Sequence, residues 1–340
     1  MSYLLVAVLA SQRHMYRTPV PFLLVPVIVI VQLVLSGTEE FLGVKALWPL
    51  TNGSDVIAHR LNPIAPWLAG RALGSTSHPI PLGILMAICV VLCLWAAIKK
   101  GRTSYWIIAV AAAVVLLFSG TRSAILALIV AIVFWFSTTG GPRRLPSYVL
   151  ATMAFLIVIS SVDPETIPGM SGFSASESYT HRANVLEFFP QLWQRDLFEL
   201  FFGSGFTSIS SLLQSSVFAG GSGIQVFDQE YIRTLTATGI IGFSLLVLAL
   251  LEGLRRGNVP SRLVLICLAV TFFSFDTLSW NLLMTLFVIA ASGPLFEVKK
   301  IESENVYPAI RDSLNGGRMG RLFSSQQVRL NAELTLNDSK

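Results

Sequence analysis

Long apolar runs, separated by short polar or charged segments, fill the chain from residue 19 to residue 296. Runs of about 20 apolar residues are what a helix needs to cross the hydrocarbon core of a bilayer. A transmembrane β-barrel would show strict alternation of apolar and polar residues, which these runs lack. The pattern predicts an all-α polytopic membrane protein with about eight transmembrane helices. We expect them near residues 19–36, 79–98, 104–118, 123–137, 147–161, 231–251, 262–275 and 279–296.

Polar segments divide the chain further. Residues 162–227 are rich in Gly and Ser and separate the fifth predicted span from the sixth, so we expect one large external loop there. Residues 1–18 form a cytoplasmic N-terminal segment or the end of a shortened helix. Residues 298–340 are polar and charged, which predicts a mostly disordered cytoplasmic tail. The transmembrane domain then covers residues 19–297.

Composition agrees with a membrane protein. The 340 residues are 53% hydrophobic and only 13% charged, with a mean hydropathy of +0.67. A typical soluble domain carries about 25% charged residues. The net charge is +5, but the basic residues lie in short loops between spans. Membrane orientation explains them better than nucleic-acid binding does, so we expect no nucleic-acid partner.

Basic clusters also predict the orientation. With the predicted spans, all of them fall on one side, which the positive-inside rule makes cytoplasmic, together with both termini. The polar connection 37–78, the turn 119–122 and the large loop then face outward. The clusters are Arg13 with Arg17, Lys99 with Lys100 and Arg102, Arg143 with Arg144, Arg255 with Arg256 and Arg262, and Lys299 with Lys300.

Arginines on the outer side are not explained by that rule. Arg122 ends a tight Ser-Gly-Thr-Arg turn between two apolar helices, near membrane depth. A guanidinium there needs an anionic partner or water, and its planar fork suits bidentate binding of phosphate. Snorkelling to headgroups or pairing with a loop carboxylate would account for Arg122 equally well. The other outer arginines are Arg71, Arg182, Arg195 and Arg233.

Two carboxylates, Asp228 and Glu230, stand where the external loop enters the sixth predicted span. Acidic groups are costly there and so indicate a site. They can accept a proton from an attacking sugar hydroxyl, or they can complement the helix dipole, which spacing alone favours. His181 is either a loop acid/base or simply a solvated side chain.

Signals for a cofactor are missing from the sequence. It contains no phosphate loop, no nucleotide-binding fingerprint and no cluster with metal-ligand spacing. Gly203 to Phe206, GSGF, is too short for a nucleotide loop. Cys89, Cys93 and Cys267 lie in apolar runs, which is typical of packing. We therefore expect no metal and no cofactor, and an enzyme of this kind would use a lipid-borne, already activated donor.

Four stretches follow one another in an order typical of one family. RALGSTSHPIPLG leads into the second span, and LLFSGTRSAILAL holds the arginine turn. HRANVLEFFPQLWQRDLFELFFGSGF lies in the external loop, and DQEYIRTLTATGIIG closes that loop and begins the sixth span. Through these stretches the region from Arg71 to Phe296 resembles the O-antigen ligase and O-antigen polymerase (Wzy-type) superfamily of bacterial envelope enzymes.

The resemblance implies metal-independent transfer of glycan from undecaprenyl diphosphate, on the outer face of the bacterial inner membrane. Arg122 and Arg182 match arginines thought to hold the diphosphate, and Arg71 is a further candidate. In the ligases the last stretch begins with His followed by Asn, Ser or Gln. Here Gln229 and a later Gly-x-x-Gly pair match, but Asp228 takes the histidine position, which suits the polymerase branch better.

These matches predict a polysaccharide polymerase that joins a growing chain to a lipid-linked repeat unit of O-antigen, capsule or exopolysaccharide. Asp228, with Glu230, would orient or deprotonate the acceptor hydroxyl. Arg122 and Arg182 would stabilise charge on the leaving diphosphate. The expected substrate-binding residues are Arg71, His181, Arg195, Gln229 and Arg233.

Two other functions stay open. An O-antigen ligase would move finished glycan to a lipid A core or another acceptor. A transport or non-catalytic membrane protein of a polysaccharide operon would show internal repeats or paired broken helices, and we detect no repeat. The expected partners are the undecaprenyl-diphosphate-linked oligosaccharide, the lipid bilayer, and a chain-length regulator and flippase of the same pathway.

Overall fold

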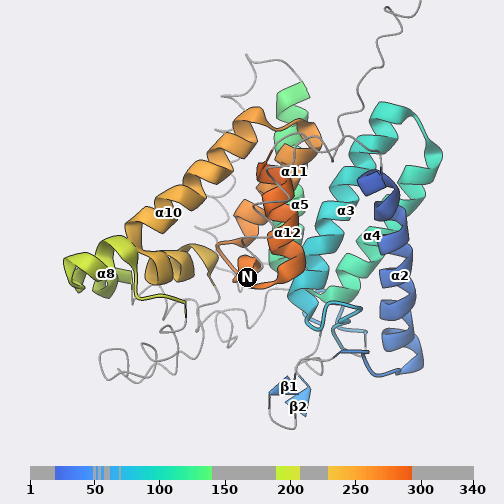
Figure 1. Ribbon diagram of the computed structural model, residues 1–340. Coiled ribbons are helices and arrows are strands. Elements are labelled where there is room, and N and C mark those ends of the chain that lie inside the picture. The colour runs from blue at the N-terminus through green and yellow to red at the C-terminus, as the bar shows by residue number, and fades with distance from the viewer. Residues whose placement is uncertain are drawn as a thin grey trace, which may run out of the picture. The chain divides into compact units, whose positions relative to one another are not determined.

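The computed structural model describes residues 20–48, 51–52, 55–56, 62–68, 70–139, 189–206 and 229–292. All of them belong to one compact unit, Met1–Phe296, and they are mainly helical (Figure 1). A single antiparallel pair of two-residue strands, β1 (Thr51–Asn52) and β2 (Asp55–Val56), is present among them. The helices are α2 (Val20–Leu42), α3 (Pro79–Lys100), α4 (Thr103–Ser119), α5 (Arg122–Thr139), η4 (Phe189–Gln194), α8 (Leu197–Phe202), α10 (Glu230–Arg256), α11 (Val259–Thr271), η5 (Thr277–Ser279) and α12 (Asn281–Ala291).

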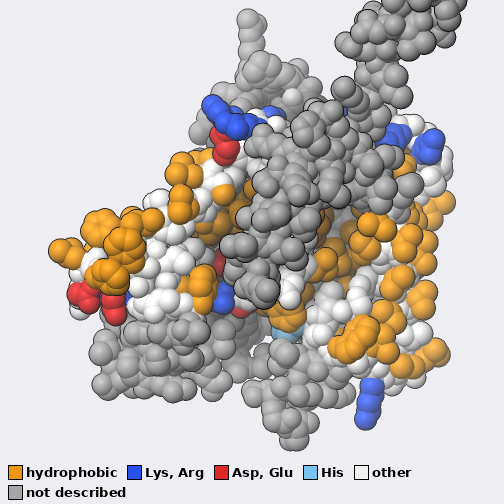
Figure 2. All heavy atoms as spheres, in the orientation of Figure 1, with side chains coloured by type: hydrophobic (Ala, Val, Ile, Leu, Met, Phe, Trp, Pro, Cys, Tyr) orange, Lys and Arg blue, Asp and Glu red, His pale blue; other side chains and the backbone are white. Residues whose placement is uncertain are grey.

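Three of the described helices are long and apolar enough to cross a membrane: Leu24–Leu42 of α2, all of α3 and all of α10. Four more helices, α4, α5, α11 and α12, are apolar but shorter. Hydrophobic side chains also cover much of the described surface (Figure 2). These features support a helical membrane protein. The eight-span count and the external loop stay predictions, because residues 147–161 and most of 162–227 lie outside the described residues.

Local capping explains why the predicted boundaries of the second and third spans agree with α3 and α4. His78 is the N-cap of α3, where its Nδ1 accepts a hydrogen bond of 3.2 Å from the Ile80 amide, and Pro79 follows at a position that proline favours. Gly101 and Gly120 end the two helices in the left-handed conformation, with φ of 63° and 62°. Glycine adopts this conformation without the strain that a Cβ causes.

The first predicted span was too short at its C-terminal end. We expected a polar connection from residue 37, but α2 continues to Leu42. The carboxylate of Glu39 explains the longer helix, because its Oε2 accepts hydrogen bonds from the amides of Leu73 (2.7 Å) and Gly74 (3.3 Å). A polar residue that bonds to a neighbouring loop can stay helical at the end of a membrane segment.

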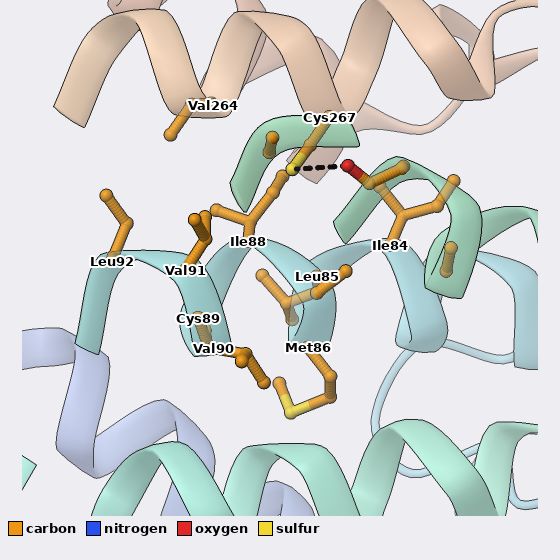
Figure 3. Packing of buried hydrophobic residues seen from close by; sticks show 14 of the residues in the cluster. Ile84, Leu85, Met86, Ile88, Cys89, Val90, Val91, Leu92, Val264 and Cys267 are labelled. Carbon is orange, nitrogen blue, oxygen red and sulfur yellow. Dashed lines mark hydrogen bonds between the residues drawn. The ribbon is translucent and has the colours of Figure 1, made fainter. Parts of the chain in front are cut away.

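The core is organised around α3, which contacts α2, α4, α5 and α11. Its residues Leu82 to Cys93 are buried without interruption (Figure 3). On α5, three fully buried alanines at helical spacing let α11 approach closely. At this contact the Cys267 thiol is 3.8 Å from the carbonyl oxygen of Ala127. All three cysteines are free and buried, as the expected packing role requires.

Candidate functional site

Two of the predicted outer segments, the polar connection 37–78 and the turn 119–122, meet between α4 and α5. Arg71 donates from Nε to the carbonyl oxygen of Ser119 (2.9 Å) and from Nη2 to the hydroxyl of Thr121 (3.2 Å). The same hydroxyl donates to the carbonyl oxygen of Pro79 at 3.0 Å. Arg122, the first residue of α5, follows this turn directly. The structure therefore brings the backbone position of Arg122 and the side chain of Arg71 to one place.

Asn62 is a polar residue of this turn that the sequence did not single out. Its Nδ2 donates to the carbonyl oxygens of Leu117 (2.9 Å) and Phe118 (3.1 Å), which lie at the C-terminal end of α4. Each of these carbonyl oxygens also accepts a backbone bond, from the Gly120 amide (3.1 Å) and the Ala72 amide (2.9 Å) respectively, so Asn62 adds a second bond to each. A Cβ on Gly120 would come within 2.7 Å of Asn62 Oδ1, so the close fit needs glycine. The only sequence signal was the Asn-Pro pair, which is typical of turns.

His78 connects the start of α3 to the turn between α11 and α12. Its ring is stacked on Phe275, with ring centroids 5.8 Å apart, and lies 5.7 Å from the ring of Trp280. The same turn carries Leu278, whose amide donates to Glu230 Oε2 at 2.7 Å. Elements far apart in the sequence, α3, α10 and the α11–α12 turn, are thereby joined through one set of contacts.

Glu230 is buried, with 1% of its surface exposed. Besides the Leu278 amide, its carboxylate accepts a hydrogen bond of 2.9 Å from the hydroxyl of Thr234. Its own amide donates to the carbonyl oxygen of Phe272 at 2.9 Å. A buried carboxylate needs such partners. In this arrangement Glu230 fastens the first turn of α10 to the α11–α12 turn, and its role toward an acceptor hydroxyl stays a prediction.

Arg233 lies one helical turn beyond Glu230. Its Nη1 is 4.0 Å from Glu230 Oε1, and its side chain is 19% exposed. The guanidinium carbon lies 5.2 Å from the centroid of the Phe206 ring, a cation–π distance. Nη1 is buried and has no hydrogen-bond acceptor among the described residues. The Arg233 guanidinium is therefore held near the N-terminus of α10 by Glu230 and Phe206, and its Nη1 is a donor without an acceptor among the described residues.

Helix α10 is broken at Gly239, where φ is 65° and ψ is −168°. Backbone carbonyls near the break accept bonds from the segment that follows α8. The Ser204 amide donates to the carbonyl oxygen of Thr236 (3.1 Å), and the Gly205 amide donates to that of Ala237 (2.9 Å). Irregular backbone at membrane depth is tolerated where protein satisfies its polar groups in this way. The GSGF segment, which is too short for a nucleotide loop, therefore braces a broken helix.

Two glycines make this contact between α8 and α10 possible. A Cβ on Gly203 would overlap the backbone of Ala237, and a Cβ on Gly239 would overlap the backbone of Phe201. Both glycines also have positive φ, 76° and 65°. Gly203 belongs to the third stretch that carries the family resemblance and Gly239 to the fourth, so these two stretches interlock in space.

Arg195 supports the same break from the side. Its Nη1 donates to the carbonyl oxygen of Thr236 at 3.1 Å, while its buried Nη2 has no acceptor among the described residues. Burial lowers the pKa of Arg195, and the negative charge of Glu199 opposes that shift. Arg195 also lines a small cavity with Trp193 and Glu199.

A larger cavity of about 360 Å³ lies between η4 and α10. Its volume is within the range of small-molecule sites. Its lining is apolar apart from one serine and a tyrosine whose hydroxyl donates to the carbonyl oxygen of Ala269 (3.1 Å). The lining residues are Trp193, Tyr231, Ile232, Leu235, Ile240, Phe243 and Ser244.

The predicted site residues thus fall into groups. Arg71 and Arg122 meet at the α4–α5 turn, and Glu230 and Arg233 lie at the mouth of α10. Gln229 is the buried N-cap of α10, and Arg195 lies at the α10 break. In the part of the chain that the structure describes, no three His, Cys, Asp or Glu side chains gather as a metal site would require. Asp228, Arg182 and His181 lie outside the described residues.

In comparisons with known proteins, no family model matches the chain. No curated protein matches it either. The resemblance to the O-antigen ligase and polymerase superfamily therefore rests on the four stretches alone.

Proposed function

We propose that this protein is a polysaccharide polymerase of the bacterial inner membrane. It would transfer a glycan from undecaprenyl diphosphate to a lipid-linked repeat unit on the outer face, within a fold of eight spans and one large external loop. The observation that supports this best is the hydrogen bonding of Arg71 to the turn that leads into Arg122. Two arginines beside one turn between apolar helices, with Arg122 as the first residue of α5, suit a diphosphate on a lipid carrier.

The reaction would be a substitution at the anomeric carbon. The acceptor hydroxyl oxygen forms a bond to that carbon, the bond from the carbon to the diphosphate oxygen breaks, and Asp228 takes the hydroxyl proton. Arg122 and Arg182 would stabilise the charge that develops on the leaving undecaprenyl diphosphate. Arg71 would hold the α4–α5 turn so that the Arg122 guanidinium is in place when the bond breaks.

The contact between α8 and α10 also supports the proposal. The third and fourth stretches that carry the resemblance are far apart in sequence, yet the Gly205 amide bonds to the carbonyl oxygen of Ala237. A shared site for donor and acceptor requires these stretches to meet, since one is expected to bind diphosphate and the other to activate the acceptor.

The test compares Arg122→Ala and Asp228→Ala with Arg102→Ala, which changes an exposed arginine between α3 and α4. We expect all three proteins to reach normal levels in the membrane, and only the first two to lose long-chain polysaccharide. The purified protein should extend a synthetic lipid-diphosphate repeat unit, and both variants should fail to do so. Normal chain length in both Arg122→Ala and Asp228→Ala would refute the assignment.

One observation favours an O-antigen ligase as a second candidate. Gln229 and the glycines Gly239 and Gly242 fit the ligase form of the last stretch. Deletion of the gene distinguishes the two functions. Loss of a polymerase leaves single repeat units on their acceptor, whereas loss of a ligase leaves long chains on the carrier lipid.

A transport function is favoured by the break in α10, because transporters bind substrates at broken helices. Transporter folds usually pair two such helices, and α10 is the one broken helix among those described. Extension of repeat units by the purified protein in detergent, where no compartment exists, would exclude transport as the sole activity.

A further inference from the structure

The short helix α8 carries large apolar side chains on the side that faces away from α10. Leu197, Phe198, Phe201 and Phe202 are 73%, 70%, 44% and 58% exposed. They are spaced so that they share one face of the helix. Figure 2 shows hydrophobic side chains gathered over α8, with acidic side chains at their edge. So much exposed aromatic surface on six residues indicates a partner that is itself apolar.

The other face of α8 is directed toward the protein. Glu199 and Leu200 line the small cavity together with Arg195 of the preceding segment and Leu235 of α10. Asp196 caps the helix, since its Oδ1 accepts a hydrogen bond of 2.8 Å from the Glu199 amide. A helix of six residues is not stable on its own, so its orientation is set by this packing.

Its position is fixed relative to a candidate membrane-crossing helix. The chain leaves α8 through Gly203, whose backbone approaches α10 too closely for any side chain, and the Ser204 and Gly205 amides bond to α10 carbonyls. These contacts lie between Thr236 and Gly239, within the first three turns of α10. Helix α8 is therefore attached to the N-terminal half of α10, the half through which the chain enters the predicted membrane span.

Helix α10, to which the segment after α8 is bonded, has an exposed apolar face of its own. Ile241, Leu245, Leu248 and Leu251 are 43–62% exposed and recur every three or four residues, so they form one stripe along α10. On a helix of membrane-crossing length such a stripe faces lipid.

From these two exposed apolar faces on elements bonded to each other, we propose that α8 lies in the interfacial zone of the bilayer and inserts Leu197, Phe198, Phe201 and Phe202 among the lipid chains. The inference goes beyond the proposed enzymatic function and requires only a helical membrane protein. Most interfacial helices combine apolar residues with Lys and Arg. Helix α8 instead carries Glu199 and the cap Asp196 beside its apolar face. Insertion should therefore depend on apolar contact alone and be insensitive to anionic lipid.

The test places a fluorescent label on the full-length protein in nanodiscs. Phe198→Cys and Phe202→Cys are labelled, and Gln194→Cys, at an exposed polar position of η4, is the matched control. The native Cys89, Cys93 and Cys267 are buried, so the unaltered protein should remain unlabelled. We expect brominated lipid to quench the labels at 198 and 202 several-fold more strongly than the label at 194. Aqueous iodide should show the reverse order, equally in phosphatidylcholine and in mixtures with phosphatidylglycerol.

Quenching of the labels at 198 and 202 by iodide, at the level of the control, would overturn the proposal. Labels that are protected from both quenchers would also overturn the proposal if the protection disappears when each nanodisc holds one copy. In that case a second copy, and not lipid, covers this face. If the cysteine variants do not fold, hydrogen exchange of the unaltered protein replaces them. Protection of the amides of residues 197–202 should then be greater in nanodiscs than in short-chain detergent, and equal protection would contradict insertion.

Discussion

Helices α3 and α10 are both long and apolar enough to cross a membrane, but they are built in opposite ways. Of an 18-residue apolar stretch in each helix, 83% is buried within the protein in α3 but only 39% in α10. Helix α3 is capped at both ends and contacts four other helices. Helix α10 is interrupted at Gly239 and has a loop bonded to its carbonyls. The comparison indicates that α3 mainly packs against other helices. Helix α10 packs less and instead bonds to polar groups of the loop.

The largest effect is expected from filling the contact at the break. Gly203→Ala and Gly239→Ala each force a Cβ into neighbouring backbone at positive φ. We expect each to lower the free energy of unfolding by about 2–6 kcal/mol, or to prevent folding, through strain and overpacking. Thermal unfolding in detergent measures this. Gly37→Ala is the matched control, because a Cβ there meets nothing within 4 Å, and an equal loss in the control would contradict the explanation.

The two helices should also differ in how much stability is lost when a large apolar side chain is removed. Leu82 of α3 is fully buried, and Leu245 of α10 is 62% exposed. Leu82→Ala should lower the free energy of unfolding by about 2–4 kcal/mol because it leaves a void in the core. Leu245→Ala should have little effect, since lipid or detergent fills the space that the side chain leaves. Equal losses measured by chemical denaturation would mean that the stripe on α10 is also packed against protein.

The hydrogen bonds of Glu230, which attach α10 to the α11–α12 turn, should contribute less to the free energy of unfolding than the core does. Glu230→Ala leaves the Leu278 amide and the Thr234 hydroxyl without their acceptor. We expect a loss of about 1–3 kcal/mol, the cost of buried donors without partners. Glu252→Ala, near the other end of the same helix, is the control because the Glu252 side chain is 40% exposed and pairs with the exposed Arg255 and Arg256. If both substitutions cost the same, Glu230 does not fasten α10.

The smallest expected effect concerns the brace at the break. Arg195→Lys removes the planar fork that bonds to the carbonyl oxygen of Thr236 and should cost about 0.5–1.5 kcal/mol. The informative measurement is hydrogen exchange, which should become faster near Thr236 to Gly239 while α3 is unchanged. Faster exchange across α3 as well would show that Arg195 supports the whole fold and not the break.

Much of α3 could be predicted from the sequence because its limits are local. Pro79 and Gly101 mark its ends, and the apolar run between them has membrane length. The end of α2 could not be predicted, since Glu39 stays helical only through its bonds to a distant loop. The end of the seventh span and the start of the eighth also differ from α11 and α12, because residues 272–280 form a turn that bonds to Glu230.

The candidate site was less predictable than the helices. Arg71, Arg122 and Glu230 were named from charge at membrane depth, a signal that a sequence carries openly. Asn62 was missed because an asparagine in a polar connection looks like any turn residue. The break at Gly239 was missed because a glycine within an apolar run is compatible with a continuous helix. Only the approach of Gly203 explains why the chain departs from helical geometry there.

The contacts over the α4–α5 turn are made mainly to backbone oxygens, those of Leu117, Phe118 and Ser119. The side chains of Leu117 and Phe118 can therefore be exchanged without removing an acceptor, whereas the Ser119 hydroxyl accepts a hydrogen bond from the Thr121 amide (3.3 Å). Transplanting this turn into another scaffold would require Asn62 and Arg71 together with the whole segment from Ser119 to Arg122. A designer would thus obtain the Arg71 guanidinium at a fixed place beside the backbone of Arg122 from two short segments.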